Sequence, residues 1–229
     1  MKFMTLGMCL AVLVSCGTAT KNGALIGTGA GAALGAIIGK IAGNTAVGAA
    51  IGGAVGAGTG ALIGKHMDKV KAQAQAVQNA QVESVTDANG LQAVKVTFDS
   101  GILFATGSST LSATAKNSLG KFAEVLKQNT DCDVAVQGYT DNAGWKNSTA
   151  EQSVQKNLNL SQQRAQAVTN YLNSLGVSNN QIRSTTGFGE ANPVADNSTA
   201  AGKAQNRRVE VYMYASQAMI QAAEAGTLQ

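Results

Sequence analysis

The chain has 229 residues, of which 27 are glycine and only 4% are aromatic, and its formal net charge is +4. This length accommodates one domain of ordinary size with additional segments, and the low aromatic content confines a core of large side chains to part of it. No basic patch interleaved with aromatic residues is present, which argues against a nucleic-acid-binding protein.

The first 15 residues have the composition of an export signal, with Lys2 followed by a mostly apolar stretch. The sequence Leu-Val-Ser-Cys that ends at Cys16 resembles a bacterial lipobox. This resemblance implies that 1–15 is a lipoprotein signal peptide and that Cys16 becomes the lipidated residue of a short N-terminal segment, 16–22. Gly17 after the cysteine resembles outer-membrane sorting signals. The alternative is an ordinary cysteine in a short apolar helix.

Glycines recur at every fourth position through residues 23–64, with a slip of one position near 43–45. Residues i and i+4 share one helix face, so each series would form a thin groove that lets two helices pack closely. We expect a glycine-zipper helical hairpin over 23–64. Its packing residues are Gly27, Gly31, Gly35, Gly39, Gly52, Gly56 and Gly60. Two environments remain open: a bilayer, which each half is just long enough to span, or a hairpin or oligomer in the periplasm.

The chain becomes polar after residue 64. Residues 65–81 are rich in Ala, Gln and Lys and predict a helical connector. Two runs of alternating residues, 82–86 and 91–98, flank the pair Asn89-Gly90, which is a strong signal for a β-hairpin. We expect the inward face of its second strand to carry Val94, Val96 and Phe98.

Helices and strands then alternate to the end of the chain, which predicts an α/β (α+β) sandwich whose small mixed sheet is covered by helices on one face. The expected elements are a loop over 99–111, a helix capped by Ser112 with the core stripe Ala115, Leu119, Phe122, Ala123 and Leu126, a strand over 133–139, a helix over 161–175 capped by Ser161, strands near 182–186 and 207–214, and a tail over 216–229 that forms a short helix.

Several spaced motifs between Phe98 and Tyr214 resemble the peptidoglycan-binding, OmpA-like C-terminal domain of Gram-negative outer-membrane proteins and lipoproteins. The matching residues are Gly138-Tyr139-Thr140-Asp141, Asn157, Leu160-Ser161, Arg164-Ala165, Gly187-Phe188-Gly189-Glu190, Pro193, Asn197 and Asn206-Arg207-Arg208-Val209-Glu210. The resemblance implies that residues 82–215 fold as such a domain.

Asp141 and Arg164 are the only strongly charged groups in two otherwise neutral stretches. A carboxylate at a strand end beside a guanidinium on the first turn of a helix would suit a ligand that carries both an ammonium and a carboxylate. The resemblance implies that the two clasp meso-diaminopimelate of the peptide stem, that Thr140 and Asn157 assist, and that Arg208 adds charge nearby. The alternatives from the residues alone are an Asx turn at Asp141 and a solvated or locally paired Arg164.

Two features depart from the family pattern. The loop 142–156 is longer than the usual spacing, and Trp145 within it either forms a wall of the pocket or, as we favour, bulges into solvent. Ala105 and Gly107 stand where many relatives have Asp and Asn, which predicts fewer polar ligand contacts.

Together these patterns predict a non-catalytic outer-membrane lipoprotein that tethers the membrane to peptidoglycan, with its domain facing the periplasm. The alternative function is a glycine-zipper assembly or pore-forming oligomer in which peptidoglycan binding is secondary. An enzyme lacks support, because His66 is the only histidine and no zinc-ligand spacing, nucleophile elbow or pair of catalytic carboxylates is present.

We expect no cofactor and no metal, and we assign His66 to an interface or to solvent. Signal-peptide removal and lipidation would leave Cys132 as the only thiol, so no disulfide is expected.

Overall fold

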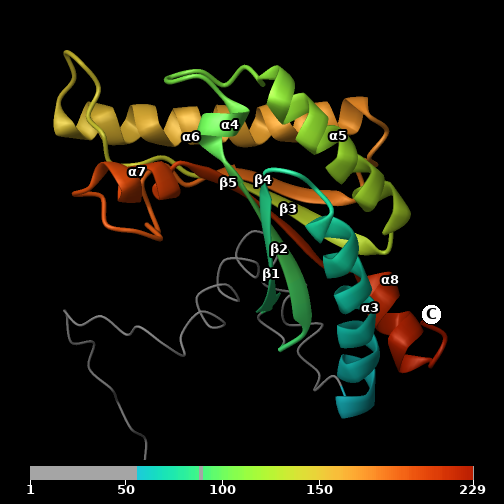
Figure 1. Ribbon diagram of the computed structural model, residues 1–229. Coiled ribbons are helices and arrows are strands. Elements are labelled where there is room, and N and C mark those ends of the chain that lie inside the picture. Colours follow the sequence, from blue (N-terminus) through green and yellow to red (C-terminus); the bar gives the residue numbers. More distant parts are fainter. Residues whose placement is uncertain (1–55, 88–89, 229) are drawn as a thin grey trace, which may run out of the picture.

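The computed structural model describes residues 56–87 and 90–228 (Figure 1). At its centre is a five-stranded sheet with the order β1-β2-β5-β3-β4. The strands are β1 (Ala80–Thr86), β2 (Gln92–Asp99), β3 (Cys132–Gly138), β4 (Ile182–Gly187) and β5 (Arg208–Ala215). All neighbouring strands are antiparallel except β3 and β4, which are parallel, so the sheet is mixed as expected.

Helices pack against one face of this sheet, and α5 and α6 cross it side by side (Figure 1). The helices are α3 (Ala57–Gln75), α4 (Ser100–Leu103), α5 (Ala113–Gln128), α6 (Ala150–Ser174), α7 (Ala200–Asn206) and α8 (Gln217–Glu224). The main core joins the inward residues of β2, β3 and β5 to α3, α5, α6 and α8. The predicted α/β sandwich is therefore confirmed.

The hairpin of β1 and β2 also forms as predicted. Gly90 adopts a positive φ of 77°, a backbone conformation that glycine reaches without strain. Val94, Val96 and Phe98 are buried, and the Phe98 ring meets Phe122 of α5 edge-on at 5.6 Å between centroids. This aromatic contact joins the second strand of the hairpin to the helical layer.

The predicted signal peptide, the lipidated segment with Cys16, and the zipper glycines Gly27, Gly31, Gly35, Gly39 and Gly52 lie outside the described residues. Gly56 and Gly60 are described, and a Cβ added to either would meet no other described atom within 4 Å. Their predicted partners lie outside the described residues, so the zipper packing stays a prediction.

The sequence predicted a boundary between the zipper hairpin and the connector at residues 64 and 65, but a single helix, α3, runs across that position. The helix continues because its apolar face extends across the same position. Its residues Ile63, Met67, Val70 and Ala74 are all fully buried against the domain. No helix within the described part of the chain is long and apolar enough to cross a membrane.

The start of α6 was predicted wrongly. The helix begins at Ala150, where Thr149 and Gln152 form a capping box, and not at Ser161. The inward face of the extra turns carries Ser153 and Asn157. Because both residues are polar, the spacing of apolar residues does not indicate a helix there. Residues 150–156 of the stretch assigned to a long loop are therefore helical.

Candidate functional site

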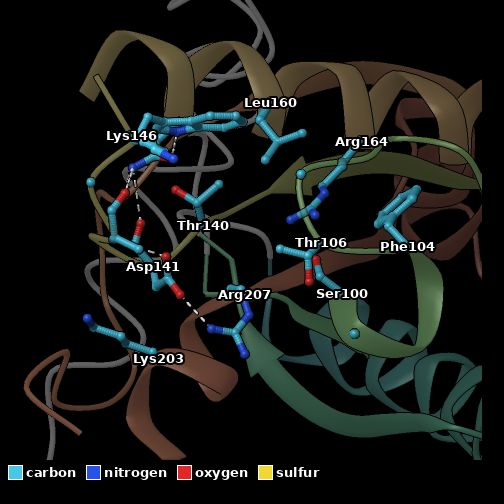
Figure 2. A pocket seen from close by; sticks show the side chains of 16 residues that line it. Ser100, Phe104, Thr106, Thr140, Asp141, Lys146, Leu160, Arg164, Lys203 and Arg207 are labelled. Carbon is cyan, nitrogen blue, oxygen red and sulfur yellow. Dashed lines mark hydrogen bonds and ion pairs between the residues drawn. The ribbon is translucent and has the colours of Figure 1, made fainter. Parts of the chain in front are cut away.

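A cavity of about 570 Å³ opens where the chain leaves β3, bounded by α4 and the loop after it, by α6, and by the segment that joins α7 to β5 (Figure 2). Of the five residues predicted to form the site, Thr140, Asp141, Asn157 and Arg164 line this cavity. They come from two distant parts of the chain, the end of β3 and the middle of α6.

Two glycines let α6 lie directly on the strand ends. A Cβ at Gly138 would come within 2.2 Å of the Ser161 carbonyl oxygen, and one at Gly187 within 2.2 Å of the Gln162 nitrogen. Ser161, which was expected to cap the helix, is buried in this contact, and its hydroxyl accepts a hydrogen bond from the Gly189 backbone N–H at 2.8 Å. The close packing brings the polar face of α6 to the residues that follow β3.

Arg164 is a buried cation, with only 4% of its surface exposed. Its guanidinium donates to the backbone carbonyls of Ser108 at 3.0 Å and Ala105 at 3.4 Å and lies 5.2 Å from the centre of the Phe104 ring. No carboxylate within the described ranges forms an ion pair with it. Burial lowers the pKa of Arg164, the nearby Arg207 lowers it further, and Asp141 opposes both. A buried cation that faces a cavity without an acidic partner favours an anionic ligand.

The position of Arg164 corrects one part of the expected chemistry. It lies in the middle of α6 and not in its first turn, so the helix N-terminus adds no attraction for an anion there. Ala105 contributes its backbone oxygen, which accepts a hydrogen bond from Arg164. The attraction for an anion comes from the guanidinium itself.

Asp141 lies opposite Arg164 across the cavity and is also buried (Figure 2). One of its oxygens accepts the Ala143 N–H at 3.1 Å, as in an Asx turn, and the other pairs with Nη1 of Arg207 at 2.5 Å. The Asx turn, considered as an alternative to a site, is therefore present within the site. A carboxylate has about four lone-pair positions, so these two contacts leave room for a ligand ammonium.

Two hydroxyl groups at the cavity are buried with no hydrogen-bond partner among the described residues. They are Oγ1 of Thr140 and Oγ of Ser100, whose residues are 4% and 1% exposed. The backbone fixes both residues, because Thr140 N–H donates to the Gly189 carbonyl at 2.8 Å and Ser100 N–H donates to the Arg207 carbonyl at 3.0 Å. Buried hydroxyls are normally hydrogen-bonded, so these two suit a polar ligand. Sequence reasoning missed Ser100, which carries no motif of its own.

Trp145 forms a wall of the cavity, so the favoured prediction of a solvent bulge is wrong. Its indole N–H donates to Oδ1 of Asn157 at 2.7 Å, and its backbone N–H donates to Ser153 at 3.0 Å. The Asn157 amide in turn donates to the carbonyls of Ala143 and Asp141 at 3.2 and 3.4 Å. Asn157 therefore holds the loop and the indole in place, and its role is to shape the cavity.

The sequence assigned an additional positive charge at the site to Arg208, but the structure places Arg207 there. Arg208 points to the other face of the sheet, where its Nε donates to Glu210 at 2.7 Å and its guanidinium lies 3.8 Å from the centre of the Tyr139 ring. Arg207 lines the cavity instead. Successive side chains of an extended segment point to opposite sides, so a shift of one residue exchanges the two arginines.

The cavity lining has an excess of positive charge. Arg164, Arg207, Lys146 and Lys203 are its cationic residues, and Asp141 is its only acidic one. This balance favours an acidic ligand with one ammonium group over a neutral or basic ligand.

Two family models match the sequence. The model described as OmpA family matches residues 103–207, and the one described as glycine zipper matches residues 26–71. Among curated proteins, "Probable lipoprotein YiaD" of Escherichia coli K12 is 39% identical over 149 residues, which are 65% of this chain and 63% of that protein. "Peptidoglycan-binding protein ArfA" of Mycobacterium tuberculosis is 43% identical over 93 residues, which are 41% of this chain and 26% of that protein. The chain thus spans less than two thirds of either relative.

Solved structures share the fold. A putative MotB-like protein from Desulfovibrio vulgaris has a TM-score of 0.57 at 21% identity, over 69% of this chain and 96% of that one. The cell wall anchor of the type VI secretion system (T6SS) from Pseudomonas aeruginosa has a TM-score of 0.52 at 28% identity, over 66% of this chain and 97% of that one.

Proposed function

We propose that the cavity between β3 and α6 binds the peptide stem of peptidoglycan without catalysis, because residues 103–207 match the OmpA family model. The observation that carries the proposal is Arg164, a buried cation that faces the cavity and has no acidic partner in the described chain. Relatives named as a peptidoglycan-binding protein and a cell wall anchor support the ligand class.

The ligand group we assign to the cavity is the free end of meso-diaminopimelate, which carries an ammonium and a carboxylate on one carbon. Arg164 receives the carboxylate and Asp141 receives the ammonium. The hydroxyl of Thr140, which has no hydrogen-bond partner among the described residues, binds the same free end of diaminopimelate. Arg207, already paired with Asp141, orients that carboxylate and adds positive charge beside the ligand.

Trp145 and Asn157 shape this site. The indole closes one side of the cavity and is held by the Asn157 amide, so the longer loop narrows the space around the ligand. The stem of peptidoglycan is acidic, and the lysines of the cavity, Lys146 and Lys203, match that character.

The N-terminal part of the chain enters the proposal through its sequence. We propose that Cys16 is lipidated and holds the protein at the outer membrane, with the domain in the periplasm, so that the chain tethers the membrane to the cell wall. Relatives named as a lipoprotein and as outer-membrane proteins support this location. The glycine-zipper segment would then lie between the anchor and the domain.

The proposal predicts that Asp141→Ala abolishes the retention of the protein on purified sacculi that contain diaminopimelate. The change removes the acceptor for the ligand ammonium and leaves Arg207 without its partner. The measurement is a sedimentation assay with the full chain in detergent, comparing bound fractions of the wild type and the variant.

Asp68→Ala is the matched control, because Asp68 is exposed on α3 and does not line the cavity. This variant is expected to sediment as the wild type does. Equal retention of the Asp141 variant and the wild type would refute the assignment of Asp141.

A further inference from the structure

A cluster of metal-ligating side chains lies where α3 meets the start of β3, outside the cavity described above. His66 is on α3, and Asp131 and Cys132 stand at the beginning of β3. One ligand atom from each of these residues lies within 4.8 Å of the other two. Nε2 of His66 is 3.2 Å from Oδ2 of Asp131. Imidazole, carboxylate and thiolate are the three donors that zinc takes from proteins.

The spacing fits a tetrahedral ion. Metal–ligand distances of about 2.0 Å to nitrogen or oxygen and 2.3 Å to sulfur place tetrahedral N and O donors ~3.3 Å apart and S and N donors ~3.5 Å apart. The observed distance of 3.2 Å between His66 and Asp131 agrees with the first value. The thiol lies close enough to complete the set after small side-chain movements.

The backbone holds the cluster in position without a metal. Cys132 N–H donates to the Asn129 carbonyl at 3.1 Å, and Cys132 pairs with Ala215 of β5. The Asn129 side chain donates to Gln73 of α3 at 2.6 Å, which fixes the helix against the same turn. Cys132 is fully buried, whereas about a third of the Asp131 side chain is exposed (35%), so an ion and a water in the fourth position have access from that side.

We propose that His66, Asp131 and Cys132 bind one zinc ion that fastens α3 to the sheet. Binding replaces the thiol proton of Cys132, which passes to solvent, and involves no oxidation or reduction. Since α3 includes the last residues of the matched glycine-zipper segment, the ion strengthens the attachment of that segment to the domain.

The neighbouring thioether distinguishes zinc from copper(I). Sδ of Met67 is 3.9 Å from Sγ of Cys132 and is fully buried. A site for copper(I) would use the two sulfurs and the imidazole and would not need the carboxylate, because copper(I) prefers soft donors. Zinc requires Asp131 and does not require Met67.

The test is a titration of the full chain in detergent with zinc(II) against a chromophoric chelator, in a background with Cys9→Ala and Cys16→Ala so that Cys132 is the only thiol. We expect one bound equivalent, and a weakening of at least tenfold for each of Cys132→Ala, His66→Gln and Asp131→Asn, with Met67→Leu unchanged. Cobalt(II) gives a sulfur-to-metal charge-transfer band that disappears in the Cys132→Ala variant. Zinc raises the melting temperature of the background protein but not of these three variants.

Circular dichroism of the metal-free variants shows that each is folded, and Asp131→Asn, at a partly exposed side chain, tests the site even if Cys132→Ala does not fold. Absence of a stoichiometric zinc equivalent, or zinc affinity that survives Asp131→Asn, overturns the proposal. Copper(I) affinity that depends on Met67 and not on Asp131 overturns the choice of metal.

Discussion

Arg164→Gln is expected to weaken binding to diaminopimelate-containing peptidoglycan by about a hundredfold, or ~2.7 kcal/mol. The substitution removes the guanidinium that we assign to the ligand carboxylate, so the carboxylate would enter the cavity without its cationic partner. The lysines at the cavity do not replace it, because a planar guanidinium can donate two parallel hydrogen bonds to a carboxylate and an ammonium cannot. The measurement is the affinity of the full chain for soluble stem peptide by isothermal titration calorimetry.

The same substitution should change the free energy of unfolding by less than about 1 kcal/mol. Arg164 loses two hydrogen bonds to backbone carbonyls, but its burial and its repulsion from Arg207 already disfavour the charged side chain. Arg183→Gln is the control, because Arg183 is a half-exposed arginine of β4 that pairs with Asp133 away from the cavity. An affinity of the Arg164 variant within threefold of the wild type would remove the principal support for the site.

Gly187→Ala is expected to lower the free energy of unfolding by about 3 kcal/mol or more. The new Cβ would lie 2.2 Å from the nitrogen and 2.5 Å from the Cα of Gln162. These are backbone atoms of α6 and cannot move aside by a rotamer change, so the whole helix must shift from the sheet. Because α6 also carries Asn157 and Arg164, ligand binding should weaken as well. Urea unfolding followed by circular dichroism measures the first effect.

Gly120→Ala provides the matched control in α5. A Cβ there meets no atom within 4 Å, and alanine is favoured over glycine inside a helix by about 1 kcal/mol. This variant should therefore be slightly more stable than the wild type. A Gly187 variant as stable as the wild type would show that α6 does not need this close approach to the strand ends.

The elements that sequence reasoning predicted well are those in which a local signal and burial agree. Ser112 caps α5 as expected, and its hydroxyl accepts the Ala115 N–H. The five apolar residues of the α5 stripe are fully buried. The hairpin follows from the turn signal that Asn89-Gly90 gives in the sequence and from the alternation that ends at Phe98.

The errors occur where polar residues face inward. Ser153 and Asn157 occupy core-facing positions of α6, so the helix extends further than its apolar period indicates. Ser100 and Arg207 reach the cavity only because distant strands bring α4 and the end of α7 together. The spacing of residues along the sequence cannot predict such a contact. Asp141 and Arg164 were predicted from their isolated opposite charges and from the resemblance, and both residues line the cavity.

The most direct measurement compares two tripeptides that differ only at the third residue, L-Ala-γ-D-Glu-meso-diaminopimelate and L-Ala-γ-D-Glu-L-Lys. Both carry the ammonium that we assign to Asp141, but only the first carries the carboxylate that we assign to Arg164. Titration calorimetry with the full chain is expected to give at least a hundredfold tighter binding of the diaminopimelate peptide, and Arg164→Gln should remove most of that difference. Equal affinity of the wild-type protein for the two peptides would contradict the account.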